Sequence, residues 1–446
     1  MKLFVYPILI ILVLSGCATV DTSGEWSKVK DYTFKKTGIE AVWEKHKSER
    51  DFINKEIERL LSDGLTRDDA VWISILNNPR LQSVFEEIGI AKAELVQAGL
   101  LKNPIVSAFF KLPLSGGPTG FEIEGVFSLL DLWQIKPRKK IASARLEAVI
   151  LKVYEEILNT SIEAKRLYYE YVLSSYMKDE IEKIKNETDN LKEQVKYFGD
   201  FGFSNELDIK RANIAALEQE IEYTSIETSL QLARMNLNRI MGFMPDKMDY
   251  DIIKEISEDA ALPSDISKLI DKAFSNRLDL KINELKINEA TELLGLEYRG
   301  IIEELEAGLS YEKKTEGEEF FTPSLRFSIP IFNTNRAQIA KAEFVLRQAV
   351  KELNETKLRI REDVLKTVER MKEIRQKIYI IKELIIPKQR EAVQYAEKYF
   401  NAMQLNLLQV IEARIELLKS QKRLFEEMLE KKRTELELEK AIGGIL

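Results

Sequence analysis

The chain has 446 residues, of which 45% are hydrophobic and 32% charged, with 19 Gly, 11 Pro, one Cys and one His. So few Gly and Pro residues exclude a turn-rich all-β protein, and the many Lys, Glu, Leu, Ile and Ala residues are typical of long helices. The net charge of −7, with both signs interleaved, argues against a nucleic-acid partner. One Cys and one His leave no basis for a zinc site, a disulfide framework or a Ser-His-Asp triad, so we expect neither a metal nor an enzyme.

The N-terminus has the form of a secretory signal. Lys2 is followed by a continuous apolar run from Leu3 to Leu14. This run is too short to span a bilayer, which takes about 20 helical residues. It ends in Leu14-Ser15-Gly16-Cys17, which resembles the lipobox of bacterial lipoproteins and contains the only cysteine. The resemblance implies that residues 1–16 are removed and that Cys17 carries a lipid; we expect no other cofactor.

The mature chain is predicted to contain two similar halves. Residues 17–64 form a polar linker with a possible short helix from about Ile39 to Leu61, in which His46 is solvated. The first repeat covers residues 65–241, a connector covers 242–261, and the second repeat covers 262–446. Three landmarks recur in the same order with offsets of 199, 200 and 202, namely Asn77–Leu81 with Asn276–Leu280, Ser128–Leu132 with Ser328–Phe332, and Tyr197-Phe198 with Tyr399-Phe400.

Each half is predicted to run helix, strand, strand, long helix, helix. The four strands alternate apolar and polar residues, so each has one apolar and one polar side. Turns at residues 115–120 and 313–317 join the strands as two hairpins. The apolar positions are Val106, Ala108, Phe110 and Leu112, then Phe121, Ile123, Val126, Phe127 and Leu129, then Leu305, Ala307, Leu309 and Tyr311, and finally Phe321, Pro323, Leu325, Phe327, Ile329 and Ile331.

Periodicity alone leaves two interpretations of these strands open. In a soluble protein the apolar sides would pack on a core or on helices. In a membrane barrel they would face lipid, and the polar sides would face a watery lumen. Four strands are too few to close a barrel, and membranes tolerate no open sheet edge. Three copies of the chain would supply 12 strands and so resolve this difficulty.

The predicted long helices favour the membrane interpretation. One stretch, from Lys139 to about Tyr197, has roughly 60 residues without Gly or Pro and would span about 90 Å. Its counterpart runs from about Ala337 to Phe400; we expect Pro387 to kink it and to leave a backbone carbonyl unpaired. This second helix carries one apolar stripe at coiled-coil spacing, formed by Ile360, Val364, Val368, Met371, Ile374, Ile378 and Ile381.

Together the lipobox, the duplicated order of elements and the landmarks resemble the TolC-like outer-membrane efflux proteins, in a lipoprotein form. The segments Asn77–Pro79, Ala98–Pro104 and Phe327–Phe332 carry the resemblance most clearly, and it covers about Leu65 to Gly443. It implies a mainly α fold with a β-hairpin pair, which as a homotrimer forms a 12-stranded outer-membrane β-barrel continued by a long periplasmic α-helical barrel. It implies a channel without an active site, working with a periplasmic adaptor and an inner-membrane pump in a tripartite efflux or type I secretion system.

The resemblance also places a periplasmic constriction at the turns after the long helices. The first turn runs from Tyr197 to Asp208 and the second from Tyr399 to Glu412. In the family, acidic side chains just after each turn ring the constriction, and Asp208 and Glu412 match such positions. Gln409 stands where another acid is common. Three copies would place six carboxylates in a narrow aqueous neck, which favours cations and makes conduction sensitive to pH and divalent ions.

The two predicted turns differ in their glycines. Gly199 and Gly202 fit a tight turn in the first half, because glycine adopts left-handed backbone conformations without strain. The second turn, Ala402 to Asn406, has no glycine.

A second interpretation, from a different class, is a lipid-anchored periplasmic coiled-coil scaffold or adaptor without a pore. The alternating strands and the duplication favour the channel, because a scaffold needs neither. A carboxylate-based hydrolase is less well supported, because the acidic residues are spread along helix faces. The inner-membrane partner would select the cargo, so drugs, metals and proteins all stay open as substrates.

Overall fold

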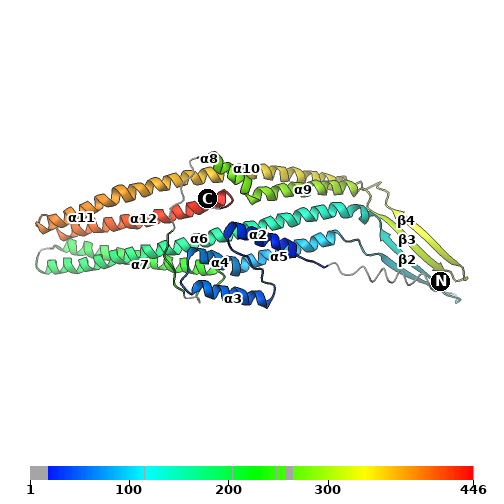
Figure 1. The fold of residues 1–446 in the computed structure, drawn as a ribbon, viewed down its shortest axis with the longest axis horizontal. Helices are drawn as coiled ribbons and strands as arrows, with labels where there is room; N and C mark the ends of the chain where they lie inside the picture. Colours follow the sequence, from blue (N-terminus) through cyan, green and yellow to red (C-terminus); the bar gives the residue numbers. More distant parts are fainter. Residues whose placement is uncertain (1–18, 115, 203, 247–249, 257–264, 445–446) are drawn as a thin grey trace. The chain divides into compact units, whose positions relative to one another are not determined.

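The computed structural model describes residues 19–114, 116–202, 204–246, 250–256 and 265–444. These residues are mainly helical and contain one four-stranded antiparallel sheet (Figure 1). The chain divides into two compact units, each built from both halves of the sequence. The unit that we call the sheet unit comprises Val84–Val153, Leu278–Lys357 and the described part of Met1–Val29, and the helical unit comprises the described residues of Lys30–Ser83, Tyr154–Arg277 and Leu358–Leu446.

The same order of helices and strands occurs twice along the chain. After α2 (Ser23–Thr37) and α3 (Lys47–Leu61), the first half contains α4 (Arg67–Asn77), α5 (Pro79–Ala98), β1 (Ile105–Lys111), β2 (Gly120–Ser128), α6 (Leu130–Asp200) and α7 (Glu206–Ile240). The second half contains α8 (Ile266–Asn276), α9 (Leu278–Arg299), β3 (Leu305–Lys313), β4 (Glu319–Phe327), α10 (Arg336–Tyr379), the π-helical segment η1 (Ile380–Ile385), α11 (Ile386–Asn401) and α12 (Leu407–Ala441). The repeat boundaries that we infer from the sequence stay predictions.

The helices observed in the N-terminal linker differ from the one that the sequence predicts. A helix, α2, forms where we expected none, and the helix expected from about Ile39 begins only at Lys47. Before it, Ile39, Ala41 and Trp43 are buried at alternate positions, as in an extended segment. The side chain of Gln82 supplies the hydrogen bonds that a helix would make: its Oε1 accepts from the Glu44 N–H at 2.9 Å and its Nε2 donates to the Val42 carbonyl at 2.9 Å. His46 lies directly before α3 and is exposed, in agreement with the prediction that it is solvated.

The first long helix begins earlier than expected. Helix α6 has 71 residues and includes Pro137, whereas the sequence predicts a start at Lys139. Proline has no N–H to donate to the carbonyl four residues before it, here that of Trp133. Nη1 of Arg299 lies 3.5 Å from this carbonyl oxygen and supplies a donor from α9. A side chain remote in sequence thus lets the helix continue through proline.

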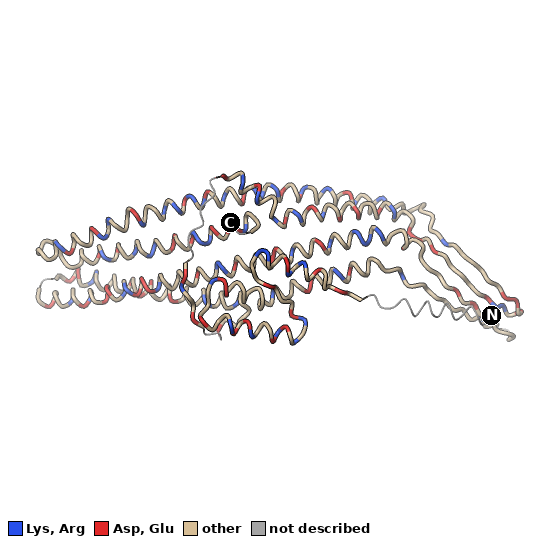
Figure 2. Tube along the Cα trace, in the orientation of Figure 1, with Lys and Arg blue, Asp and Glu red and all other residues tan. Residues whose placement is uncertain are grey.

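The second long helix accommodates Pro387 through a different local structure. Directly before Pro387, residues Ile380–Ile385 form a π-helical segment, a common way to accommodate a break in the α-helical hydrogen-bond ladder. On this helix Ile360, Val364 and Ile374 are at most 2% exposed, so the predicted stripe is a packing face. Charged residues of both signs lie along the helices (Figure 2).

Shortly after the last helix of each half, a glycine lies against the end of the short helix that begins that half. Gly242 has φ +77°, and a Cβ built on it would lie 2.2 Å from the Asn77 carbonyl oxygen. Gly443 has φ +72°, and its Cβ would lie 2.9 Å from the backbone nitrogen of Arg277. The side chain of Asn78 donates to the Ile240 carbonyl at 2.9 Å, and that of Arg277 donates to the Ala441 carbonyl at 3.4 Å. The two halves therefore close on themselves in the same way.

The core of the helical unit is aromatic where α6 meets the connector. Tyr168 is fully buried, and its hydroxyl donates to the Ile253 carbonyl. Burial raises the pKa of Tyr168 to about 12, so the hydroxyl keeps the proton that it donates. Leu65 forms a parallel bridge with Ile252, which ties the connector to the start of the first half.

We predict that Gly242→Ala destabilises the protein. Left-handed backbone costs a non-glycine residue about 1–3 kcal/mol, and the new methyl group also collides with the Asn77 carbonyl. Gly295→Ala is the control, because Gly295 lies in α9 and a Cβ added there would meet no atom within 4 Å. This control change should stabilise the helix by about 0.5–1 kcal/mol. Thermal unfolding of the detergent-extracted variants measures both, and an unchanged midpoint for Gly242→Ala would contradict the account.

Candidate functional site

The sheet has one apolar and one polar face. Its strand order is β1-β2-β3-β4, and the pairing brings the predicted apolar positions within the four strands onto one face, except for Val126. Val126 lies on the other face, which carries most of the charged residues of the strands together with Ile105, Phe109 and Phe320. The apolar face is open: Val106 and Phe321 are each 69% exposed and Phe110 is 76% exposed. The predicted alternation is therefore confirmed, and the apolar sides do not pack into a core as they would in a soluble protein.

The polar face of the sheet carries ion pairs that cross the strands. Nζ of Lys111 on β1 contacts Glu312 and lies 3.4 Å from Glu122. On β4, Arg326 contacts Glu124 and lies 4.0 Å from Glu306. Each cation thus holds two carboxylates from neighbouring strands.

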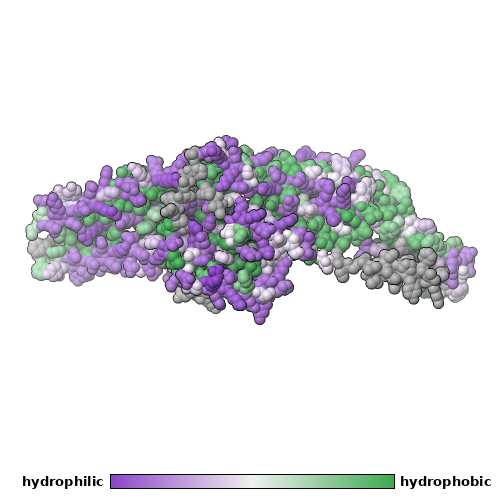
Figure 3. Space-filling model, viewed as in Figure 1, coloured by the Kyte–Doolittle hydropathy of each residue, from purple (hydrophilic) through white to green (hydrophobic). Residues whose placement is uncertain are grey.

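Exposed apolar residues continue from the sheet into the adjoining ends of the sheet unit. Phe332 is fully exposed, Ile331 is 70% exposed, and Leu132 and Trp133 are each more than half exposed. Figure 3 shows hydrophobic residues gathered where the helices of this unit give way to strands. The uncovered apolar surface therefore extends beyond the strands themselves.

The first predicted turn joins α6 to α7. Gly202 has φ +78° and donates its N–H to the Gly199 carbonyl at 2.9 Å. Asn205 caps α7, because its Oδ1 accepts from the Asp208 N–H at 2.9 Å. Asp208 is half-buried, and the preceding Tyr197 is exposed.

Gly199 contributes to the first turn in a different way from Gly202. It lies in the last turn of α6, and only Gly202 has a left-handed backbone. A Cβ on Gly199 would come within 2.7 Å of Cδ1 of Ile209. The absent side chain therefore lets α7 pack closely against α6, and the carbonyl of Gly199 accepts the hydrogen bond from Gly202 that closes the turn.

The second turn reproduces the first without glycine. Met403 takes the left-handed conformation, with φ +55°, and donates to the Phe400 carbonyl at 2.8 Å. Asn406 caps α12 by accepting from the Gln409 N–H at 3.1 Å. Glu412 and Gln409 are exposed, as is Tyr399.

Superposing the caps fixes which residues correspond. Asp208 and Gln409 each lie three residues after their capping Asn, so Gln409 takes the place of Asp208 in the second half. By the same count, Glu412 corresponds to the exposed Arg211. The offset here is 201, one less than the pairing of Tyr197 with Tyr399 suggests. The two turns thus carry unlike charges at equivalent positions.

The helices that carry the turns pack together. Leu191 and Val195 of α6, Ala212 of α7 and Ile411 of α12 form a buried cluster, with Ile209, Leu407 and Ile415 against it. Lys422 of α12 lies 2.5 Å from Glu222 of α7, and Arg414 of α12 lies 2.6 Å from Glu397 of α11. The two hairpins therefore form one packed end of the helical unit.

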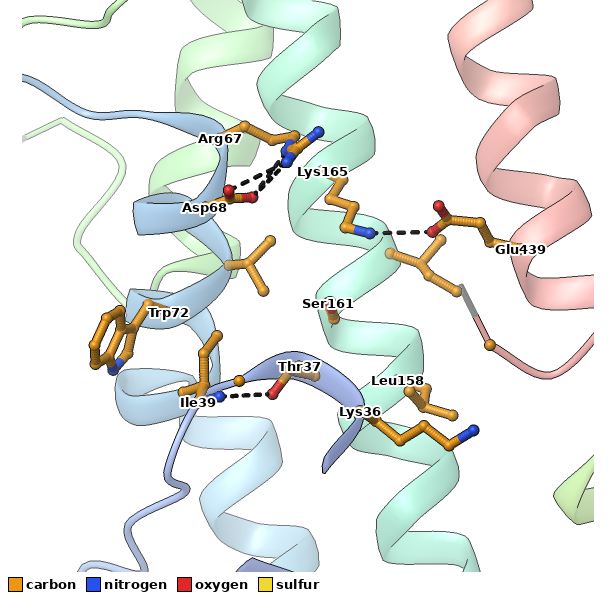
Figure 4. Close-up of a pocket in the computed structure, with 14 residues that line it drawn as sticks. Lys36, Thr37, Ile39, Arg67, Asp68, Trp72, Leu158, Ser161, Lys165 and Glu439 are labelled. Atoms are coloured by element: carbon orange, nitrogen blue, oxygen red, sulfur yellow. Dashed lines mark hydrogen bonds and ion pairs between the residues drawn. The ribbon is translucent and has the colours of Figure 1, made fainter. Parts of the chain in front are cut away.

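A cavity of about 430 Å³ lies in the helical unit among α2, α4, α6 and the end of α12 (Figure 4). Lys165 reaches Glu439 at 3.1 Å across it, and Arg67 pairs with Asp68 at 2.8 Å. Trp72 and Ile39 supply part of its apolar lining.

Other candidate features lie elsewhere or outside the described residues. The predicted lipidation site, Cys17, lies outside them. The described residues include no group of three or more His, Cys, Asp or Glu side chains arranged for a metal ion. In the same part of the chain, no helix is long and apolar enough to cross a membrane.

Sequence reasoning missed the ion pairs of the polar face and the caps of the turns. The caps had a signal in the sequence, because Asn is a common N-cap residue and Asn205 and Asn406 each precede a long helix. In the structure each Asn side chain accepts a hydrogen bond from the backbone N–H three residues later. Two of the ion pairs, Lys111 with Glu312 and Arg326 with Glu124, join residues about 200 positions apart. Only the register between β2 and β3 brings them together.

We predict opposite responses of the two turns to glycine exchange. Gly202→Ala places a side chain in left-handed backbone at a cost of about 1–2 kcal/mol, which raises local opening about fivefold or more. Met403→Gly removes such a cost and should not raise opening. Hydrogen exchange of the amides at each turn measures this, and an equal rise in both variants would contradict the assignment.

The chain is similar to known proteins both in part of its sequence and in its fold. The family model described as "Outer membrane efflux protein" matches residues 269–444. No curated protein matches the sequence. Among solved structures, the outer-membrane channel OprN has a TM-score of 0.73 at 16% identity, covering 87% of this chain and 92% of its own. CusC, described for its folding and transmembrane channel formation, scores 0.70 at 16% identity with the same coverages. The CmeC outer membrane channel of Campylobacter jejuni scores 0.70 at 14% identity, covering 85% of each chain.

These comparisons confirm the predicted resemblance to the TolC-like outer-membrane efflux proteins. The family match lies in the second half, and the structural likeness extends over both halves. Residues 269–444 thus carry the sequence signature of the outer membrane efflux protein family, and the chain has the fold of outer-membrane efflux channels.

Proposed function

We propose that three copies of this chain form the outer-membrane channel of a tripartite efflux or type I secretion system. The observation that carries the proposal is the sheet, which combines an exposed apolar face with two edge strands, β1 and β4. Lipid can cover such a face, but an open edge in lipid leaves backbone groups without partners. Pairing β4 of one copy with β1 of the next removes every edge, and three copies supply 12 strands.

The helical unit supports association of the same kind. Helix α7 buries one side against its own chain, including Ala212 and Leu237. Another stripe of the helix is exposed and apolar, formed by Leu207, Ile214, Leu217 and Ile221, each more than half exposed. A neighbouring copy would bury this stripe and extend the barrel of helices into the periplasm.

The lipobox supports a location of the protein at the outer membrane. A lipid on Cys17 would tether each copy to the outer membrane, from which the helices extend through the periplasm. Energy for export would come from an inner-membrane pump, joined to the channel by a periplasmic adaptor at the turns after α6 and α11. The pump would choose the cargo, because a duct lined by polar side chains discriminates little.

The same turns would form the periplasmic constriction. Asp208 and Glu412 would contribute its carboxylates, and Gln409 would take the place of a further acid. The equivalence of Glu412 with Arg211 adds a cation at the same level of the first hairpin. The neck would therefore be less acidic than a ring of carboxylates alone.

We predict discrete conductance steps from the detergent-extracted protein in a planar bilayer. An aqueous duct through the membrane conducts ions, whereas a tethered scaffold does not. Replacing Cys17 should leave the protein in the membrane, because the barrel itself would hold it there. Release of the Cys17→Ala variant into solution, together with no conductance from either form, would favour the lipid-anchored scaffold.

Block by divalent cations should report on the constriction. We expect Mg²⁺ added on the periplasmic side to reduce the current, because carboxylates in a narrow neck attract it. Asp208→Asn should weaken the block, and Gln409→Asp should strengthen it by restoring an acid at the equivalent position. The control is Glu416→Gln, one turn beyond Glu412 on α12, where the carboxylate pairs with Lys419 at 3.0 Å. Equal block in all four proteins would exclude Asp208 from the constriction.

A further inference from the structure

We infer that the polar face of the sheet determines the ion selectivity of the outer-membrane end of the channel. The inference rests on the proposed function, which turns this face towards the lumen of the barrel. It concerns a set of charges well separated in sequence from the turns at the constriction. Six charged residues on this face carry it, namely Lys111, Glu122, Glu124, Glu306, Glu312 and Arg326.

The first group sits near the hairpin ends of the strands. Glu122 on β2 and Glu312 on β3 are directly opposite in the register. Like charges in such a pair repel, which destabilises a sheet. Lys111 of β1 reaches over β2 and contacts both carboxylates. One cation therefore holds two acids in place and leaves one negative charge uncompensated.

The second group lies nearer the helical ends of the strands. Arg326 of β4 is opposite Glu306 of β3 and reaches past it to Glu124 of β2. Gly308 is opposite Ser324 on the same face, and a Cβ there would lie 2.4 Å from Oγ of Ser324. This group again pairs one cation with two carboxylates.

The two groups give the polar face a fixed net charge of −2. Three copies would place −6 on the barrel wall, held by ion pairs and not by flexible loops. The charged side chains on the opposite, apolar face, Lys313 and Glu319, pair with each other at 3.5 Å and cancel. Fixed wall charges favour counter-ions over a Debye length, about 30 Å at 0.01 M salt and 3 Å at 1 M. The channel should therefore prefer cations in dilute salt and lose that preference in concentrated salt.

The test is the K⁺ to Cl⁻ permeability ratio of single channels in a KCl gradient at low salt. Glu122→Gln with Glu312→Gln removes the net charge of the polar face and should lower the ratio, leaving only the preference set by the carboxylates of the constriction. Lys111→Gln makes the face more negative and should raise the ratio above that of the unaltered protein. Glu319→Gln removes one carboxylate from the apolar face instead of the polar face and should leave the ratio unaltered.

Two controls separate this inference from the proposed function. If the double variant of Glu122 and Glu312 does not insert into the bilayer, Glu124→Gln takes its place. This single change reduces the negative charge of the polar face by one and should lower the ratio by a smaller amount. Channels that conduct with an unaltered ratio in the sheet variants would overturn the inference and leave the channel in place. A protein that never conducts, in unaltered or variant form, would overturn the proposed function.

Discussion

The structure depends on one constraint: a four-stranded sheet with an apolar outer face has two edges whose backbone groups need partners. In water, such a sheet would bury its apolar face on helices, yet Val106, Phe110 and Phe321 lie open. Lipid can cover that face but supplies no donors or acceptors to β1 and β4. Closure by further copies satisfies both requirements at once. The duplication of the chain makes this economical, because each half contributes one hairpin and the two hairpins pair through β2 and β3.

The helices meet a second requirement, which is to stay continuous over great length. Helix α6 continues through Pro137, where Arg299 offers a donor to the Trp133 carbonyl that proline leaves without one. Helix α10 reaches α11 through a π-helical segment before Pro387. The turns at their ends use the same design with different residues, Gly202 in one and Met403 in the other. The two turns differ in charge, because Asp208 in the first half is equivalent to Gln409 in the second, and Arg211 is equivalent to Glu412.

Much of this arrangement could be predicted from local patterns. The two-residue period of the strands and the stripe from Ile360 to Ile381 depend on residues close in sequence, and the structure confirms both. The errors have a common cause. The helix predicted from Ile39 yields to hydrogen bonds from Gln82, and the start of α6 depends on Arg299. The bridges made by Lys111 and Arg326 likewise depend on strand register. In each case the deciding partner lies far along the chain, where periodicity gives no signal.

The central claim is that three copies close one barrel. Native mass spectrometry of the detergent-extracted protein tests it most directly, because the number of copies follows from the mass without any assumption about conduction. The account predicts one species of three chains, each with a lipid on Cys17. A species that stays monomeric at every detergent concentration would contradict it, because β1 and β4 would then have no partner in the membrane.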